Sequence, residues 1–535
     1  MKSKNDQLEK LGILAAQSET ADAQSTFTPA VDFYRGPLSN RPEPGDANRI
    51  WIAEETGAIY YDDGNSWSLV DREYNSVSTE RLFGSFDHLI DDVSDIENLD
   101  SLVSVGDTVR VKQPDTPYVL TSQPTLDTSH IRLEFESRFA RDGNPILKIA
   151  NETNIQGLIV GQTSPTEDIT ILNYGYDGNK DNQTHTGQNK DALQFYDVTD
   201  FEVRSFYATH TYPFHEHNTG GSGISVNSDS ASNFHFENCR VYQIGDRAMQ
   251  ISGTHGTFRN IRNDDGWDRT IAFRNNAAHH VVDGIRATNC DDTSMIGFAN
   301  DPAQPTTDVL VTNASWYNLP RGLANITGAK DVTFDGVRGY NDESTTPAGI
   351  PYMYIVRFNK QAENVTVSNM DVFSTGDIER AIQCDAPVTG GTIDNVTLSN
   401  VNVQIDSAYR PVNILAPGYR FNNVTVEVTN LGGAGAVVHA EAATTMHGLD
   451  VTSTVLDIEI APGATGTVIQ NADYETIDDQ GTNTVINGEA VESAAAETPQ
   501  GDYPVGTFVD FTDSTDGTGN GYYRQKRDGT FVKLA

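Results

Sequence analysis

The chain has 535 residues, and its 75 acidic side chains outnumber 36 basic ones, which gives a formal net charge of -39 and an isoelectric point of about 4.4. Such a surface repels nucleic acid and anionic lipid, and so excludes both as direct partners. No stretch approaches the roughly 18 apolar residues that a membrane-spanning helix needs, so we expect no membrane insertion.

The deficit of cations is mostly a deficit of lysine, because 11 Lys stand against 25 Arg. At about 1 M salt charges are screened over about 3 Å, so the self-repulsion of this chain would nearly vanish. An acidic, lysine-poor composition is therefore typical of a protein from an extreme halophile. An ordinary acidic secreted protein is the alternative.

The first 103 residues divide into three predicted parts. Residues 1–34 are mostly polar and are predicted to be a docking or trimer-forming segment, and their apolar run "LGILAA" is too short for a signal peptide. Residues 35–74 are expected to form a small β-module, and this expectation is implied by a resemblance that is described below. Residues 75–103 are expected to contain a helix that caps the next domain, because their apolar residues fall on one helical face (Phe86, Leu89, Ile90, Val93, Ile96 and Leu99).

A long repeat follows residue 104. Short segments in which apolar residues alternate with other residues are each followed by Asn, Gly or Ser. These Asn, Gly or Ser positions recur at intervals of roughly 16 to 33 residues (Gly157, Asn173, Ser205, Asn238, Asn260, Gly284, Asn313, Gly336, Asn369, Asn400, Asn423, Gly448 and Asn471). Alternation indicates a β-strand, and Asn or Gly supplies the left-handed residue of a sharp bend.

A second series of strand patterns interleaves with the first at similar intervals (Leu193, Ile224, Met249, Ile271, Met295, Ile382 and Val412). Two series in phase predict a solenoid whose turns each contain at least two strands. A propeller would need a more constant period. We therefore predict an all-β protein in which residues 104–488 form a parallel β-helix.

The end of the chain predicts a linker over residues 489–500 and a C-terminal β-hairpin module over residues 501–535. The three cysteines are far apart, and each falls at an apolar position of the repeat (Cys239, Cys290 and Cys384). This pattern predicts buried thiols rather than disulfides or metal ligands.

Three stretches carry a resemblance to tailed-virus tailspike and tail-fibre proteins, whose β-helix is right-handed and pectate-lyase-like. They are "VSVGDTVRVKQPDTPYVLTS" at residues 103–122, the β-module "RIWIAEETGAIYYDDGNSWSLV", and "YGYDGNKDNQ" at residues 174–183, which resembles an Asp-Gly-Asn loop of tailspikes. The resemblance implies a homotrimer on a virion surface that contacts other virion proteins through its N-terminal segment. The paired-Asp signature of the lyases is not matched residue by residue.

Asp246-Arg247 and Asp268-Arg269 precede consecutive strands of the second series, and so does Asp292. Neighbouring β-helix turns are about 4.8 Å apart, so these carboxylates would stack at separations that glycosidases use, and all three are catalytic candidates. The alternative is a structural ion ladder, because each of the first two Asp residues has an Arg beside it. Pairing lowers a carboxyl pKa, the opposite of what a general acid needs, so we favour the ladder.

Residues in the adjoining turns are candidates for binding glycans (Arg247, Arg269, His215, Glu216, His217, Asp264, Asp265, Trp267, Trp316 and Tyr317). Among them, the aromatic side chains are expected to stack on sugar rings. The "HEH" triplet lacks a third metal ligand, and "DGNKDN" lacks the twelfth-position Glu of a calcium loop. The sequence therefore predicts no metal and no other cofactor.

Two functions follow from these features. The first is a virion spike or tail fibre that attaches a virus of a haloarchaeon to its host in high salt, by binding a surface glycan or glycoprotein. The second is a polysaccharide depolymerase, either a glycoside hydrolase or a lyase, that acts on host envelope glycans. Only the carboxylate column favours an enzyme, and the sequence leaves that question open.

Overall fold

The computed structural model describes residues 86–486, apart from 154, 184–189, 212–220, 291–293, 299–300, 343–351, 432–434, 454–455 and 475, together with separate strands near each end. The chain forms two units, Met1–Leu82 and Phe83–Ala535. Within the described part, no helix is long and apolar enough to cross a membrane.

The first unit contains one four-stranded sheet with strands in chain order (β1, Asp32–Gly36; β2, Arg49–Ala53; β3, Ile59–Asp62; β4, Trp67–Asp71). β1 pairs with β2 in parallel, and the other two pairings are antiparallel. This sheet lies where the small β-module is predicted, although β1 begins three residues before residue 35. Residues 1–31 of the predicted docking segment lie outside the described residues.

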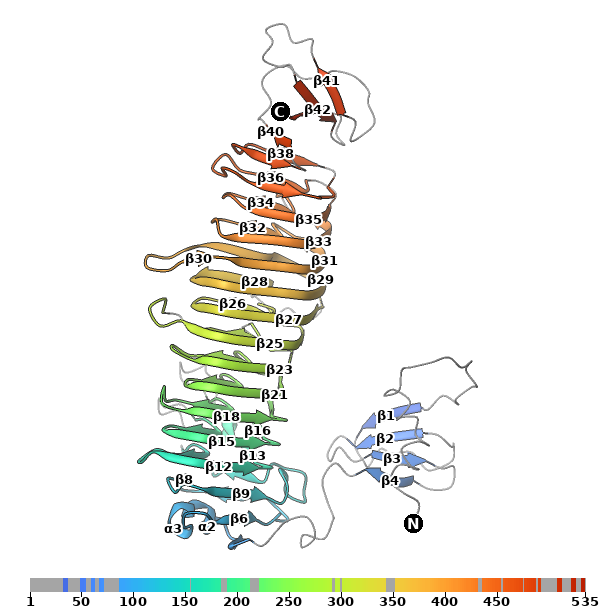
Figure 1. The fold of residues 1–535 in the computed structure, drawn as a ribbon. Helices are drawn as coiled ribbons and strands as arrows, with labels where there is room; N and C mark the ends of the chain where they lie inside the picture. The colour runs from blue at the N-terminus through green and yellow to red at the C-terminus, as the bar shows by residue number, and fades with distance from the viewer. Residues whose placement is uncertain are drawn as a thin grey trace, which may run out of the picture. The chain divides into compact units, whose positions relative to one another are not determined.

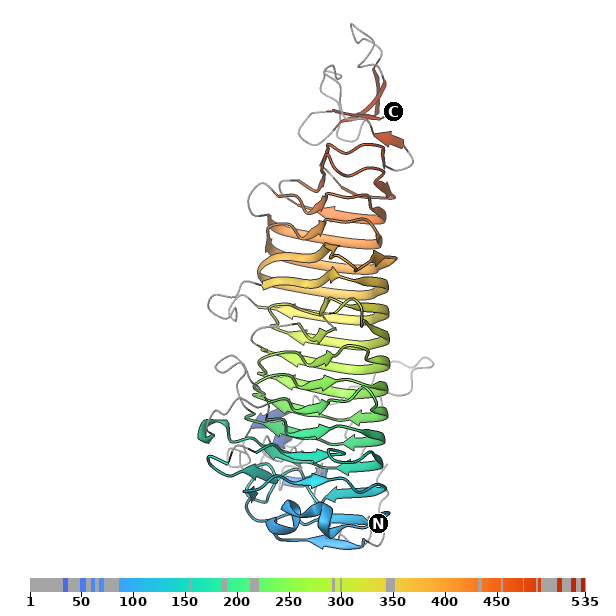
Figure 2. The ribbon, with the colours of Figure 1, turned by 90° about the vertical axis from the view of Figure 1, so that its left-hand side faces the viewer.

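The second unit is a parallel β-helix, which confirms the predicted fold class. Its strands stack in register on three sheets, and Figures 1 and 2 show successive turns one above another. We call these sheets A, B and C. Each turn therefore contains three strand segments, where the sequence predicts at least two.

Sheet A contains the longest segments (β6, Thr108–Val111; β9, Ile131–Phe135; β12, Thr166–Leu172; β15, Val198–Arg204; β18, Ser232–Glu237; β21, Thr254–Asp264; β23, Ala278–Thr288; β25, Thr306–Tyr317; β27, Ala329–Asn341; β29, Ala362–Pro387; β30, Ile393–Asp394; β31, Val396–Ala408; β33, Tyr419–Leu431; β35, Thr445–Thr452; β37, Val468–Gln470; β39, Thr484–Ile486). Sheet B begins with short strands and continues in the second halves of β21 to β35 (β7, Tyr118–Leu120; β10, Leu147–Ile149; β13, Gly175–Asp177; β16, Tyr207–Thr209; β19, Arg240–Tyr242).

Sheet C contains strands of mostly three residues and also the later residues of β29 (β8, Thr125–Leu126; β11, Leu158–Val160; β14, Leu193–Phe195; β17, Ile224–Val226; β20, Met249–Ile251; β22, Ile271–Phe273; β24, Ile296–Gly297; β26, Ala324–Ile326; β28, Tyr352–Lys360; β32, Val412–Ile414; β34, Val438–Ala440; β36, Ile458–Ile460; β38, Ile477–Asp479). These strands form the predicted second series. The register pairs Ile271 with Ile296, so the predicted position Met295 is one residue early.

The corners between sheets A and B explain the Asn and Gly series. Every member from Asn173 to Asn471 has a positive φ between 50° and 72°, whereas Gly157 does not. The Asn side chains also bond from turn to turn: Asn260 Nδ2 donates to Asn238 Oδ1 at 3.0 Å, and Asn423 Nδ2 to Asn400 Oδ1 at 3.2 Å. The corner residues therefore supply both the bend and a polar ladder that fixes the register.

The N-terminal cap differs from the single predicted helix. The described part of residues 75–103 forms a strand and two short helices, which lie below sheets B and C (β5, His88–Ile90; α2, Val93–Glu97; α3, Leu99–Leu102). Ile90, Ile96 and Leu99 are buried, while Phe86 and Leu89 are exposed. A single long helix and a strand followed by two short helices would bury nearly the same apolar positions. The spacing of apolar residues therefore could not distinguish the two arrangements.

The C-terminal strands continue beyond the last turn (β40, Glu489–Val491; β41, Phe508–Phe511; β42, Gly521–Gln525; β43, Phe531–Leu534). β40 pairs antiparallel with β39, so the predicted linker begins as a strand. β41, β42 and β43 pair antiparallel in chain order, as expected for a hairpin module. The three cysteines are buried and free, as predicted.

Candidate functional site

The outer surface of sheet C is recessed around β22 and β24. In each three-residue strand the first and third side chains enter the core, so the middle residue faces outward. These middle positions align as Gln250, Ala272, Gly297 and Asn325. Two of the four have little or no side chain, and a pocket of about 400 Å³ opens over them (Asp229, Arg247, Ser252, Arg269, Ala272, Phe273, Arg274, Asn275, Gly297 and Phe298).

Gly297 is required by the close approach of an arginine. A Cβ atom at this position would overlap Cδ and Nε of Arg269, which extends from the preceding turn across β24. Any other residue at 297 would force the Arg269 side chain to shift. The sequence "MIGF" thus leaves space for a charged group that comes from 28 residues earlier.

Arg247, Asp268 and Arg269 form a continuous ion-paired chain with Asp246. Arg247 Nε lies 2.9 Å from Asp268 Oδ2, and Arg269 Nη1 lies 3.2 Å from the same oxygen. Arg247 Nη1 is also 3.4 Å from Asp246 Oδ2. The backbone N–H of Asp268 donates to the Asp246 carbonyl at 2.9 Å, so the two Asp residues occupy neighbouring turns. The expected ion ladder is present at these four positions.

Asp246 differs from the expectation of a lowered pKa. Its side chain is almost completely buried, and its Oδ1 has no hydrogen-bond partner. Burial raises the pKa of Asp246 to about 6, because desolvation and the charges of Asp268 and Asp191 outweigh the attraction of Arg247 and Arg269. The sequence shows the adjacent arginine, which lowers the pKa of Asp246, but not the burial of the carboxyl, which raises this pKa by more.

A second buried carboxyl lies two turns below. Asp191 is 1 % exposed, and its Oδ1 accepts a hydrogen bond from the Ser222 backbone N–H at 2.7 Å. Burial raises the pKa of Asp191 despite this bond and the charge of Arg247. Two carboxyls with raised pKa values therefore lie beside a cluster of arginines.

The other predicted catalytic residue and three of the glycan-binding candidates lie outside the described residues (Asp292, His215, Glu216 and His217). Asp264 is buried on sheet B, where Arg240 Nε and Arg262 Nε contact its carboxylate at 3.1 and 2.9 Å. Asp265 is exposed at the next corner, with a φ of 51°. These two acids are therefore parts of sheet B and its corner, and neither lines the pocket.

The predicted aromatic platform on one face is not formed. Trp316 is only 3 % exposed and packs against Gly339 of the next turn, so its assignment to a sugar-binding surface is wrong. Tyr317 lies on sheet B and stacks on Tyr340 at 5.2 Å with an interplanar angle of 8°, which covers one of its ring faces. Trp267 is half-buried between sheets B and C and does not line the pocket.

Sequence reasoning missed most of the pocket lining (Asp229, Ser252, Ala272, Phe273, Arg274, Asn275, Gly297 and Phe298). Arg274 follows β22 directly, whereas Arg247 and Arg269 precede their strands. A usable signal was the loss of side-chain volume at consecutive outward positions of the second series, from Gln250 to Ala272 to Gly297. That signal becomes visible only when the strand register is known.

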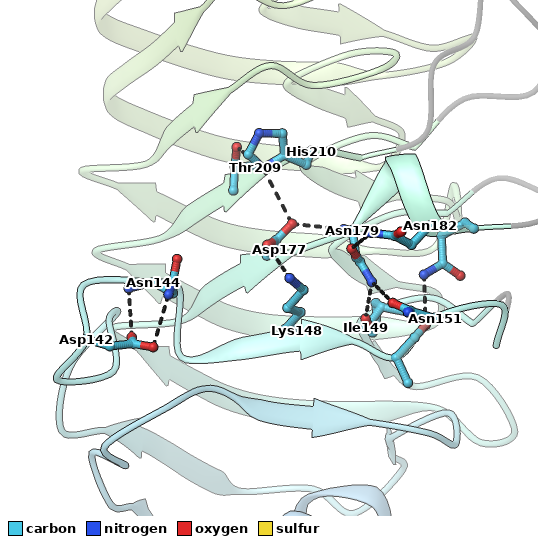
Figure 3. A network of polar contacts seen from close by, with 12 residues as sticks. Asp142, Asn144, Lys148, Ile149, Asn151, Asp177, Asn179, Asn182, Thr209 and His210 are labelled. Atoms are coloured by element: carbon cyan, nitrogen blue, oxygen red, sulfur yellow. Dashed lines mark hydrogen bonds and ion pairs between the residues drawn. The ribbon is translucent and has the colours of Figure 1, made fainter.

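The "YGYDGNKDNQ" loop is a structural network, shown in Figure 3. Asp177 lies between Lys148 of the preceding turn, at 3.8 Å, and His210 of the following turn, at 3.5 Å. Asn179 donates its backbone N–H to Asp177 Oδ1 at 2.8 Å and its side-chain amide to the Ile149 carbonyl at 2.9 Å. Among the described side chains no group of three His, Cys, Asp or Glu residues is arranged to hold a metal ion.

Comparison with known proteins gives the following. No protein-family profile matches the chain, and no curated protein matches its sequence. Among solved structures, the catalytic domain of a GH87 alpha-1,3-glucanase in complex with tetrasaccharides is similar over 79 % of this chain and 75 % of its own, with 10 % identity and a TM-score of 0.38.

Two further structures are similar at the same level. For DFA-IIIase from Arthrobacter chlorophenolicus the match covers 74 % of this chain and 93 % of that one, with 12 % identity and a TM-score of 0.37. For an alginate lyase from Paenibacillus sp. it covers 68 % and 98 %, with 13 % identity and a TM-score of 0.29.

Proposed function

We propose that this protein is a virion surface spike or tail fibre, which attaches a virus of a salt-adapted host to glycans of the cell surface through the pocket on sheet C. The observation that carries the binding site is the recess of about 400 Å³ lined by Arg247, Arg269 and Arg274 in a chain of net charge -39. Arginine donors in a fixed fork bind sugar hydroxyl and acidic groups by short-range hydrogen bonds. Such bonds persist at molar salt, where longer-range attraction is screened.

The virion assignment rests on the resemblance of the terminal modules and the β-helix to tailspikes, and on the acidic composition. We propose that the protein is a homotrimer that contacts other virion proteins through residues 1–34. Three copies of one weak glycan site would raise the avidity without any new contact. Light scattering of the full chain in molar salt tests the assembly, and a monomer would contradict it.

The binding site is tested by a single substitution at the pocket rim. Arg274 is exposed, and its guanidinium makes no ion pair or side-chain hydrogen bond within the described residues, so Arg274→Ala should fold normally. We expect this variant to bind host-envelope glycans at least about tenfold more weakly, since a charged hydrogen bond contributes about 1.5–3 kcal/mol. Arg338→Ala is the matched control, because Arg338 is likewise exposed and has no ion pair among the described side chains but lies on sheet B. Equal binding by both variants would reject the site.

One observation favours a depolymerase as the second candidate. Asp246 has a pKa of about 6, which suits a general acid, and it adjoins the pocket arginines. Removing a general acid costs about 10²- to 10⁴-fold in rate. If the protein cleaves glycans, Asp246→Asn should abolish release of sugars from host-envelope polysaccharide without lowering the melting temperature. If it only attaches, as we propose, neither protein releases sugars and both still bind.

Asp268→Asn separates the ladder from catalysis. Both arginines share Asp268 Oδ2, so the neutral amide leaves two cations short of their partner. We expect a lower melting temperature and weakened binding, because the arginines lose the group that orients them. Turnover that disappears in Asp268→Asn without any change in stability would support the enzyme instead.

A further inference from the structure

We propose that the sheet-C pocket is an oxyanion subsite, which takes a sulfate ester or a carboxylate carried by the glycan. This inference rests on the proposed glycan binding and names the chemical class of ligand. It starts from the convergence of Arg247, Arg269 and Arg274 on a single recess. Arg247 lies two residues before strand β20, and Arg269 lies two residues before strand β22. Arg274 follows β22 directly.

The charges in the pocket are incompletely balanced. Arg247 and Arg269 share one oxygen of Asp268, and the nearby Asp246 is buried with a raised pKa. Arg269 Nε is buried without a hydrogen-bond partner. Asp229, the carboxylate among the lining residues, makes no ion pair within the described residues. Three guanidinium groups thus converge where two carboxylates, Asp246 and Asp268, make ion pairs with Arg247 and Arg269.

Arg274 lacks a counter-charge of its own. Although the side chain as a whole is exposed, partial desolvation of its guanidinium beside the pocket and the like charges of Arg247 and Arg269 lower its pKa, and Asp246 opposes this only in part. The group remains protonated, since an arginine pKa starts above 12. A bound anion would therefore offset the repulsion among the guanidinium groups of Arg247, Arg269 and Arg274. An anion would also satisfy Arg269 Nε and the Arg274 donors by charge-assisted hydrogen bonds.

Later turns of the same sheet provide an internal comparison. Arg357 Nη2 lies 2.6 Å from Asp385 Oδ2, Arg380 Nη2 lies 3.5 Å from Glu379, and Arg410 Nη2 lies 3.9 Å from Glu459. Within the described residues none of these three carboxylates contacts a second arginine, although Glu459 also contacts His439.

The shape of the pocket matches the charge. Ala272 and Gly297 leave the floor open, while Ser252 and Asn275 add a hydroxyl and an amide to the lining. Asn275 is held by its Nδ2 donating to Gln304 Oε1 at 3.1 Å, so its side-chain oxygen remains available. A planar guanidinium donates two parallel hydrogen bonds to sulfate or carboxylate oxygens, which a neutral sugar hydroxyl cannot accept in the same way.

The test uses the full chain in about 1 M potassium chloride and three oligosaccharides of one backbone: neutral, sulfated and uronate-containing. Titration calorimetry should show the sulfated or the uronate form binding at least about tenfold more tightly than the neutral one. Comparison of the two anionic forms identifies which oxyanion the pocket takes. Arg274→Ala should abolish the preference, and Arg274→Lys, which keeps the charge but loses the fork, should retain part of it. Arg338→Ala should bind like the parent protein.

Two outcomes overturn the inference in distinguishable ways. If the neutral glycan binds as tightly as both anionic forms, and Arg274→Ala weakens all of them equally, the pocket binds glycans but is not an oxyanion subsite. If no oligosaccharide and no host-envelope glycan binds the parent protein, the proposed function fails together with this inference. A preference for the anionic forms that survives Arg274→Ala would place the subsite elsewhere.

Discussion

Two carboxylates, the partly buried Asp177 on sheet B and the buried Asp246 beside sheet C, have opposite environments. Asp177 accepts from the Asn179 backbone N–H and lies between Lys148 and His210 (Figure 3). Burial alone would raise its pKa, but the His210 and Asn179 contacts outweigh burial and lower it. Asp246 has one cation at 3.4 Å and an oxygen without a partner, and burial raises its pKa to about 6.

The comparison separates a structural network from a candidate binding site. Around Asp177 the polar groups of three successive turns contact one another, so the network stabilises the fold. Around Asp246 the groups are left partly unsatisfied at the edge of an open recess. A buried polar atom without a partner costs about 1–3 kcal/mol, and the Asp246 Oδ1 atom is one of several such atoms in the described residues. Its position beside an open recess is what makes it a candidate for a functional role.

The largest expected effect is on the pH dependence of stability. The folded pKa of Asp246 is about 6 against an ordinary 3.8, so the folded state holds this proton more tightly than the unfolded state. The stability that this group contributes is complete below about pH 3.8 and is lost as the pH rises to about 6, by about 3 kcal/mol. Asp246→Asn should remove this loss, so its unfolding free energy should exceed that of the parent protein at pH 7 more than at pH 4. Parallel profiles in urea unfolding would contradict the raised pKa.

The second effect is the loss of the satisfied network. Asp177→Ala removes the acceptor for Asn179 and the partner of Lys148 and His210, and should lower the unfolding free energy by about 2 kcal/mol. The sign of its pH dependence is opposite to that of Asp246: because its folded pKa is lowered, the contribution is present above about pH 3.8 and disappears in more acidic solution. Asp142→Ala is the control, since Asp142 caps only an exposed turn in Figure 3. Similar melting temperatures for both variants would refute the difference.

The smallest effect concerns a corner away from both regions. Gly336 has a φ of +70°, and a Cβ there would meet no atom closer than 3.6 Å. Gly336→Val should therefore cost about 1–2 kcal/mol through backbone strain rather than through a clash. Gly336→Asn should cost less, because Asn occupies the equivalent corner in most turns and tolerates this conformation. Thermal unfolding of the two variants makes the comparison, and equal losses would show that packing dominates at this corner.

Much of the fold could be predicted from local patterns. Alternating apolar residues and the left-handed residue that follows them are properties of a few neighbouring positions, and their recurrence implies stacked turns. The ion pairing of Asp246, Arg247, Asp268 and Arg269 followed from the same alignment. The cap was mispredicted because Ile90, Ile96 and Leu99 satisfy a helical pattern while Ile90 belongs to strand β5.

The sequence by itself therefore determined the parallel β-helix, its polar corners and the column of paired charges, because these depend on spacing along the chain. Only the tertiary structure decided that Trp316 is buried against Gly339, that Arg269 lies across Gly297, and that Arg274 joins the same recess. Each of these depends on which residue of the next turn lies opposite, and loops of variable length conceal that register. The raised pKa of Asp246 likewise depends on burial, which is a property of the assembled turns and not of the neighbouring arginine.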